Sequence, residues 1–360
     1  TAAATNGDLL GGASGRTPAG RIQLDRTERG FRPAGIAAAE LRLGALGQTG
    51  SVDIAGTVDR GDGAAPRVGL LALAGHGALT QGAGTLLDVA ALSANFPNGA
   101  VLLDPGVAGN RIQALAGVTA GGAVDIRGGA GLMEVRGSGI TAAPGSSITL
   151  RADDLDLQAA LRAAGGTVFI LPETLGRAIT LGGPDAAAGT LALGTNEIAR
   201  IGGNGGTPAL RLVIGTDGTL RAAGDILVAG NVPLRADGVA RVGTLELVAG
   251  TPGTAGGSVR QSAGTVDVAT LTGTAQGDFQ LGRAENAFDT ATGITAGTLP
   301  AAGATGAVAL GTTGALQASD ITAPVSVRVS AGGALTAGGI TAPQITLEGG
   351  TVTLAGLVQG

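Results

Sequence analysis

The stretch Gly314-Ala-Leu-Gln-Ala-Ser-Asp-Ile-Thr-Ala-Pro-Val-Ser-Val327 returns as Gly333-Ala-Leu-Thr-Ala-Gly-Gly-Ile-Thr-Ala-Pro-Gln-Ile-Thr346 after an offset of 19 residues. The offset places Leu316 on Leu335, and it places Gly314, Thr322 and Pro324 on Gly333, Thr341 and Pro343. Repeats of about 20 residues are too short to bury a core of their own, so they are typical of solenoids, in which each repeat packs on its neighbours.

Short alternations of apolar and polar residues carry this pattern upstream. They include Val52-Asp-Ile54, Val124-Asp-Ile126, Ile148-Thr-Leu150, Leu245-Glu-Leu247 and Ile345-Thr-Leu347. Alternation at period two predicts β-strands, and Gly, Asn, Asp or Pro interrupt it about every five to ten residues. We therefore expect an all-β fold, a single-stranded parallel, right-handed β-helix with coils of about 19–22 residues. In such a fold Leu316 stacks on Leu335, and Ile321 stacks on Ile340.

The composition favours a narrow interior. The chain is 44% hydrophobic but only 1% aromatic, with five Phe and neither Trp nor Tyr. Small aliphatic side chains would fill a wide sandwich core poorly, whereas they suit the slim interior of a β-helix. The 69 glycines suit its corners, because glycine accepts a positive φ at low cost.

A longer period overlies the short one. Gln81-Gly-Ala-Gly-Thr85 returns as Gln261-Ser-Ala-Gly-Thr265, and an Asn-x-Ile-like phrase starts at Asn110, Asn196 and Asn286. We expect residues 36–360 to form one continuous solenoid built from modules of about 90 residues. Residues 1–35, where Arg, Asp and Glu crowd with little alternation, are expected to form an irregular amino-terminal extension or cap.

The chain lacks the residues that several classes of function require. The chain has no Cys, no Lys and one His, His76, which removes thiol and Schiff-base chemistry and multi-His metal sites. A net charge of −5 with few aromatics disfavours nucleic-acid binding, and every apolar run is too short for membrane insertion. We therefore predict no catalytic and no cofactor-binding residue. The chain opens at Thr1 rather than Met, which we interpret as a processed product or an excised segment.

The acidic residues offer one candidate metal site. Alternation points Asp154 and Asp156 to the same side of a strand, where their oxygens could bind one Ca²⁺ weakly. A solvated acidic face explains the same pair, so no metal site is predicted beyond this Ca²⁺ candidate. Arg60-Gly-Asp62 and His76 are interpreted as parts of surface turns.

The tandem repeats, the G-A-L-x-A-x-x-I-T-A-P phrase and the N-x-I-x-x-[LI] phrase resemble filamentous haemagglutinin-like proteins, which are large secreted bacterial β-helix adhesins. The resemblance covers most of residues 40–360. It implies a rod that is secreted to the bacterial cell surface through an outer-membrane partner, and it implies no catalysis.

Our leading hypothesis is a non-enzymatic extracellular structural rod, a subunit or segment of a bacterial surface filament that stacks end to end. Val352-Thr-Leu354 and Leu357-Val358 still have strand character, and an uncapped solenoid end recruits further strands. The alternative is an adhesin that presents a cell- or glycan-binding surface on loops expected at residues 58–67, 96–110 and 275–292. A β-helix enzyme that acts on polysaccharides is the third possibility, and it requires a groove lined by carboxylates.

Overall fold

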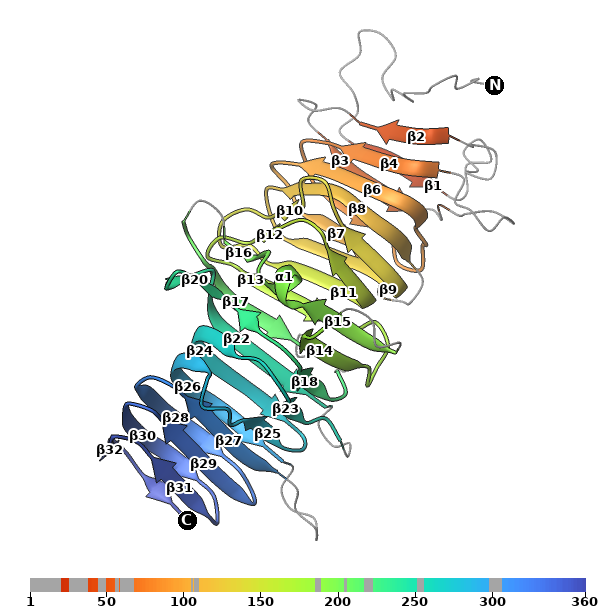
Figure 1. Ribbon diagram of the computed structural model, residues 1–360. Helices are drawn as coiled ribbons and strands as arrows, with labels where there is room; N and C mark the ends of the chain where they lie inside the picture. The colour runs from red at the N-terminus through yellow and green to blue at the C-terminus, as the bar shows by residue number, and fades with distance from the viewer. Residues whose placement is uncertain are drawn as a thin grey trace, which may run out of the picture. The chain divides into compact units, whose positions relative to one another are not determined.

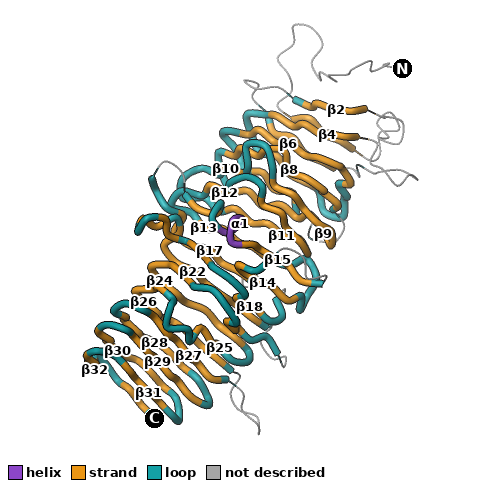
Figure 2. Tube along the Cα trace, viewed as in Figure 1, coloured by secondary structure: helices purple, strands orange, loops and turns teal. Residues whose placement is uncertain are grey.

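The computed structural model describes residues 21–25, 38–44, 50–55, 58, 68–104, 106, 110–184, 189–203, 206–216, 223–250, 256–297 and 306–360 (Figure 1). Its contacts divide the chain into two compact units, Thr1–Gly166 and Thr167–Gly360. Almost every regular element is a β-strand, and α1 (Thr195–Ile198) is the single helix in these described ranges (Figure 2). The all-β prediction is confirmed.

The strands of the first unit form parallel ladders. One ladder consists of β1 (Arg21–Asp25), β3 (Ser51–Ala55), β5 (Leu79–Gln81), β7 (Val101–Leu103), β9 (Val124–Val135) and β11 (Ile148–Leu157). The other consists of β2 (Ala38–Leu43), β4 (Val68–Ala74), β6 (Asp88–Phe96), β8 (Arg111–Ala120), β10 (Ile140–Thr141) and β12 (Leu161–Arg162). Since the chain alternates between the two ladders, each lap of backbone, or coil, lies on the previous one, as in a parallel β-helix.

Columns of like side chains fill the interior of this unit. Val52 pairs with Leu79, Leu79 with Val101, Val101 with Val124, and Val124 with Ile148. All five are at most 1% exposed. Partners in a parallel register point to the same face, so these residues form one continuous aliphatic column. Fully burying each side chain contributes roughly 1.5–3 kcal/mol.

The second unit has the same plan. One ladder contains β13 (Thr167–Leu171), β17 (Ala209–Ile214), β22 (Val242–Ala249), β24 (Val266–Ala275), β26 (Ala287–Ala296), β28 (Leu316–Thr322), β30 (Ala334–Thr341), β32 (Thr351–Leu354) and β33 (Val358–Gln359), with β19 (Val232–Pro233) beside β24. The other contains β15 (Thr190–Gly194), β14 (Ala178–Gly182), β18 (Ile226–Val228), β23 (Val259–Gln261), β25 (Phe279–Leu281), β27 (Ala307–Thr312), β29 (Ser326–Ala331) and β31 (Ile345–Glu348). Strand β16 (Ile201–Gly202) lies between α1 and β17 along the chain. The parallel β-helix is therefore the fold of both units.

The 19-residue repeat from Gly314 to Gly333 defines the register between β28 and β30. Leu316 lies opposite Leu335 and Ile321 opposite Ile340, and none of the four is more than 1% exposed. Longer turns separate the partners of other strands, as between Ile226 of β18 and its partner in β23. The offset of the two quoted stretches is thus the stacking interval of these two coils.

Some local expectations are corrected. Residues 96–110 and 275–292 are not simple loops, because the first holds β7 and the second holds β25 and the start of β26. One antiparallel hairpin, β20 (Arg235–Ala236) with β21 (Val239–Ala240), also interrupts the parallel pattern. Strand β1 lies in residues 1–35 and pairs with β3, while the rest of that segment lies outside the described residues.

Candidate functional site

A buried pair of side-chain amides joins two coils of the first unit. Asn110, 1% exposed, accepts hydrogen bonds at Oδ1 from the Leu87 backbone N–H (2.9 Å) and from Gln81 Nε2 (2.9 Å). Its Nδ2 donates to Gln81 Oε1 (2.9 Å) and to the Leu103 carbonyl (3.2 Å). The two amides bond reciprocally and also satisfy backbone groups at a coil corner. We call this arrangement an amide clasp.

The second unit contains the same clasp. Asn286, 0% exposed, accepts from the Val266 N–H (2.9 Å) and Gln261 Nε2 (2.8 Å). Its Nδ2 donates to Gln261 Oε1 (3.0 Å) and the Leu281 carbonyl (3.0 Å). The recurrent Gln and Asn phrases in the sequence therefore mark the two amide clasps, which have a structural role. Their separation in the sequence concealed that each Gln meets the Asn that follows it.

The third Asn phrase has a different structure. Asn196 is exposed on α1, and the buried residue there is Glu197, whose carboxylate accepts a hydrogen bond from the Gly194 N–H (2.6 Å). The phrase at Asn196 is therefore not equivalent to those at Asn110 and Asn286. At the clasps, the Asn amide satisfies buried backbone groups of the interior. Here, Glu197 instead satisfies a backbone N–H at the start of a helix.

The Ca²⁺ candidate residues lie together on β11. Asp154 and Asp156 are both half-buried and alternate with buried Leu155, so they share the outer face as expected. Asp154 Oδ1 accepts from the Leu155 N–H (3.1 Å), and Asp156 Oδ2 accepts from Gln158 Nε2 (2.6 Å). Among the described residues no three His, Asp or Glu side chains gather in a group able to hold a metal ion.

Two other sequence candidates show no assembled chemistry. The His76 ring lies 3.0 Å from Asn98 Nδ2 in an exposed turn. Arg60-Gly-Asp62 lies outside the described residues.

A buried ionic cluster in the first unit was missed by sequence reasoning. Arg127 and Arg151 are register partners on β9 and β11, and the Asp104 carboxylate contacts both guanidinium groups. The side chains of Arg127, Arg151 and Asp104 are 2%, 12% and 15% exposed. The stacking of Arg on Arg follows from the coil offset, so only the register brings these charges together.

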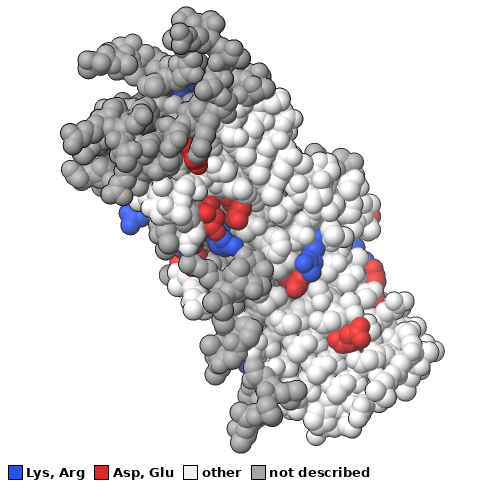
Figure 3. Space-filling view, turned by 180° about the vertical axis from the view of Figure 1, so that it is seen from behind, with Lys and Arg blue, Asp and Glu red and all other residues white. Residues whose placement is uncertain are grey.

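An arginine also links separate coils of the second unit. Arg235, on the β20–β21 hairpin, donates to Asp267 (2.5 Å) and Asp289 (2.9 Å). Burial of the guanidinium opposes its charged form, but the hydrogen bonds and charges of Asp267 and then Asp289 outweigh burial and raise the Arg235 pKa above its ordinary value. On the face drawn in Figure 3, charged side chains form small separate clusters with uncharged surface between them.

The last coil of the second unit exposes an apolar surface. Val352 lies opposite Leu335, Leu354 opposite Ala337, and Val358 opposite Ile340. These three partners are buried, yet Val352 is 44% and Leu354 61% exposed. The inward columns thus continue into this coil without cover. We call its apolar residues the terminal face: Ile345, Leu347, Val352, Leu354, Leu357 and Val358.

Strand edges accompany the apolar residues of the terminal face. Within the described chain, β31 pairs only with β29, and β32 and β33 pair only with β30. Each of these strands therefore has one edge outside the ladders. Such an edge, beside uncovered apolar side chains, is a template for a further strand.

No known protein family, curated protein or solved structure matches the chain. The resemblance to filamentous haemagglutinin-like proteins stays a prediction. Among the described residues, no helix has the length and apolar character that a membrane span requires.

Proposed function

We propose that this chain is a non-enzymatic structural rod, a subunit or segment of a filament that stacks end to end, with a coil of a second copy lying on the terminal face. The observation that carries the proposal is that the terminal face combines inward-column side chains with unpaired strand edges. Burying a Leu side chain fully contributes about 1.5–3 kcal/mol, so Leu354, 61% exposed, has roughly 1–2 kcal/mol left to gain. A stacked coil would also pair the free strand edges.

We further propose a bacterial cell-surface location, with export through an outer-membrane partner. This part rests on the resemblance of the repeats to secreted β-helix adhesins. The composition is compatible with an extracellular fibre, because the chain depends on no Cys that an oxidising environment would alter.

The stacking proposal is tested by sedimentation velocity of the full chain over a range of concentrations. We expect concentration-dependent species larger than the monomer. Leu354→Lys should weaken association about tenfold or more, because it removes apolar contact and places a charge in the interface.

Leu210→Lys is the matched control. Leu210 is 63% exposed but lies on β17, far along the chain from the terminal face. Its replacement should leave association unchanged. A chain that stays monomeric at all concentrations, or that responds equally to both substitutions, refutes stacking through the terminal face.

A further inference from the structure

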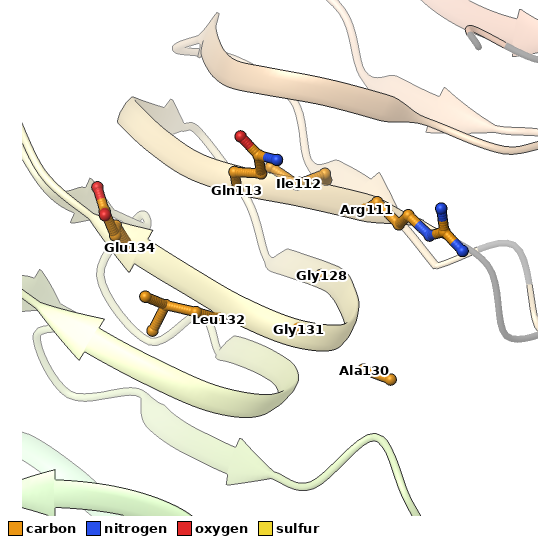
Figure 4. Close-up of a pocket in the computed structure, with 8 residues that line it drawn as sticks. All are labelled: Arg111, Ile112, Gln113, Gly128, Ala130, Gly131, Leu132 and Glu134. Carbon is orange, nitrogen blue, oxygen red and sulfur yellow. The ribbon is translucent and has the colours of Figure 1, made fainter. Parts of the chain in front are cut away.

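A hollow of about 550 Å³ between β8 and β9 is closed at both ends (Figure 4). The corner of β9 closes one end, since a Cβ at Gly129 would lie 1.9 Å from the Asn110 carbonyl oxygen. The pairing of Ala114–Leu115 with Glu134–Val135 closes the other end. The two charged residues of the lining already form ion pairs outside it. The hollow is thus a local gap in the coil stack, whereas the second unit has unpartnered polar groups on an outer sheet face.

Threonine gathers on the outer face of four neighbouring strands in the second unit, β24, β26, β28 and β30 (Figure 1). Toward the end of each strand, outward positions alternate with buried residues such as Leu271 and Ala291. We call twelve of these outward residues the threonine face: Thr270, Thr272, Thr274, Thr290, Thr292, Thr295, Gln317, Ser319, Thr322, Thr336, Gly338 and Thr341. Nine of the twelve are threonines, and none of the twelve carries a charge.

The register stacks these residues in columns that cross the strands. One column consists of Thr270, Thr290, Gln317 and Thr336. Another consists of Thr274, Thr295, Thr322 and Thr341. Neighbouring strands lie about 4.7–4.9 Å apart, and successive outward residues of a regular strand lie about 6.6–6.8 Å apart. The side chains of the threonine face therefore form a grid that repeats in two directions.

Most hydroxyls of the threonine face are available to an external partner. Thr272 donates to the Gly293 carbonyl (3.3 Å), and the Thr292 hydroxyl lies 2.8 Å from that of Ser319. The side chains of the other seven threonines make no hydrogen bond with any described residue. Threonine is stiff at χ1, so these side chains lose little freedom when they contact an ordered surface.

Strand propensity alone does not explain the threonines. The other ladder of the same unit has an outward column as well, which consists of Thr180, Leu227, Arg260, Gln280, Ala309, Arg328 and Thr346. Strand propensity favours threonine equally on both ladders. The uniform, uncharged character of the threonine face is therefore a property of that face, and the other column is mixed and carries arginines.

A charged residue, Asp320, interrupts the threonine face at a bulge. Its φ is +54°, and the adjacent coils have glycines at the aligned positions, Gly293 and Gly339, with φ of +63° and +64°. The Asp320 carboxylate lies 3.5 Å from Thr292 Oγ1. The bulge residue is extra to the alternation, so the columns on either side of it stay in register.

We propose that the threonine face binds ice. Ice presents oxygen atoms in a repeating lattice with spacings similar to those of the grid, so many hydroxyls meet lattice oxygens at once. A hydroxyl donates and accepts hydrogen bonds as water does, and the threonine methyl groups leave liquid water when the face meets the crystal. A glycan is disfavoured, because the twelve residues include no aromatic side chain to stack on a sugar ring. The proposal does not depend on stacking at the terminal face.

Slow freezing of a dilute solution of the full chain tests the proposal, because growing ice rejects solutes that do not bind it. We expect enrichment of the chain in the ice fraction, measured by gel densitometry against serum albumin in the same tube. We also expect inhibition of ice recrystallisation in annealed sucrose films. Thr290→Lys should raise the concentration needed for inhibition about tenfold or more, because a hydrated charge within the grid keeps neighbouring threonines off the lattice.

Thr180→Lys is the matched control, because Thr180 is also half-buried and outward but lies on the other ladder of the same unit. It should leave inhibition unchanged. Asp320→Gly gives the bulge the residue that both neighbouring coils have and removes its charge, so it should lower the concentration needed by about twofold or more. Circular dichroism should show that all three variants keep the β-sheet signal of the parent chain.

Two results overturn the proposal: rejection of the chain by ice as complete as that of albumin, or equal loss of inhibition in Thr290→Lys and Thr180→Lys. Binding to chitin or cellulose that Thr290→Lys abolishes, without enrichment in ice, would assign the threonine face to a polysaccharide instead. Leu354→Lys separates this proposal from stacking, because it alters the terminal face and leaves the threonine face intact. That variant should remain enriched in ice.

Discussion

Asn286→Ala removes the clasp of the second unit and tests whether this amide holds its coils together. The Asn286 side chain is 0% exposed and makes four hydrogen bonds. Its loss leaves the Val266 N–H and the Leu281 carbonyl without that partner in the interior, while half-buried Gln261 can turn toward water. Each buried backbone group left unsatisfied costs about 1–3 kcal/mol, so we expect destabilisation of about 4 kcal/mol.

For a unit of this size, that loss lowers the midpoint of thermal unfolding by about 8–16 °C. The chain has neither Trp nor Tyr, so urea and thermal unfolding should be followed by far-ultraviolet circular dichroism. Amide hydrogen exchange resolves the effect further, since protection should fall first at Val266, whose N–H donates to Asn286.

Asn196→Ala is the matched control, because it alters a similar phrase at an exposed position on α1. It should change stability by no more than about 0.5 kcal/mol. Asn110→Ala should reproduce the loss in the first unit. A cost below about 1 kcal/mol for Asn286→Ala, or one equal to that of Asn196→Ala, would refute the reasoning that the clasp stabilises the coil stack.

Two further substitutions test the first unit. Asp104→Asn leaves Arg127 and Arg151 stacked without the carboxylate they share, and we expect a loss of roughly 3 kcal/mol in urea unfolding. Gly129→Ala forces a Cβ toward the Asn110 carbonyl at a φ of +95°, and we expect a clear fall in the thermal midpoint of the first unit, with weaker amide protection at the corner.

Each of these substitutions has a control elsewhere on the surface. Glu348→Gln alters an ion pair with Arg328 in which both side chains are largely exposed, at 47% and 64%, and should cost under about 1 kcal/mol. Gly131→Ala adds a Cβ into open space and should be nearly neutral. Asp104→Asn or Gly129→Ala behaving like its control would contradict the corresponding contact.

Candidate sites were less predictable than the fold. Alternation alone placed Asp154 and Asp156 on one face of a strand, as the structure has them. The Asp104 cluster and the amide clasps each join residues of different coils. Their side-chain partners are 23 to 47 positions apart in the chain, as at Asp104 with Arg127, Gln81 with Asn110, and Asp104 with Arg151. Turn lengths vary from coil to coil, so spacing in the sequence did not reveal these partners.

The sequence by itself determined that the chain is an all-β parallel solenoid, because alternation at period two and a 19-residue offset are local properties that a strand and its neighbour share. It also determined that Leu316 stacks on Leu335 and Ile321 on Ile340. The same 19-residue offset relates both pairs, so the members of each pair occupy equivalent buried positions in successive coils. Only the tertiary structure decided which coils stay in contact and which part, where Arg stacks on Arg, and which amides meet. Those features depend on how far each turn advances the register, and that distance is a property of the packed coils.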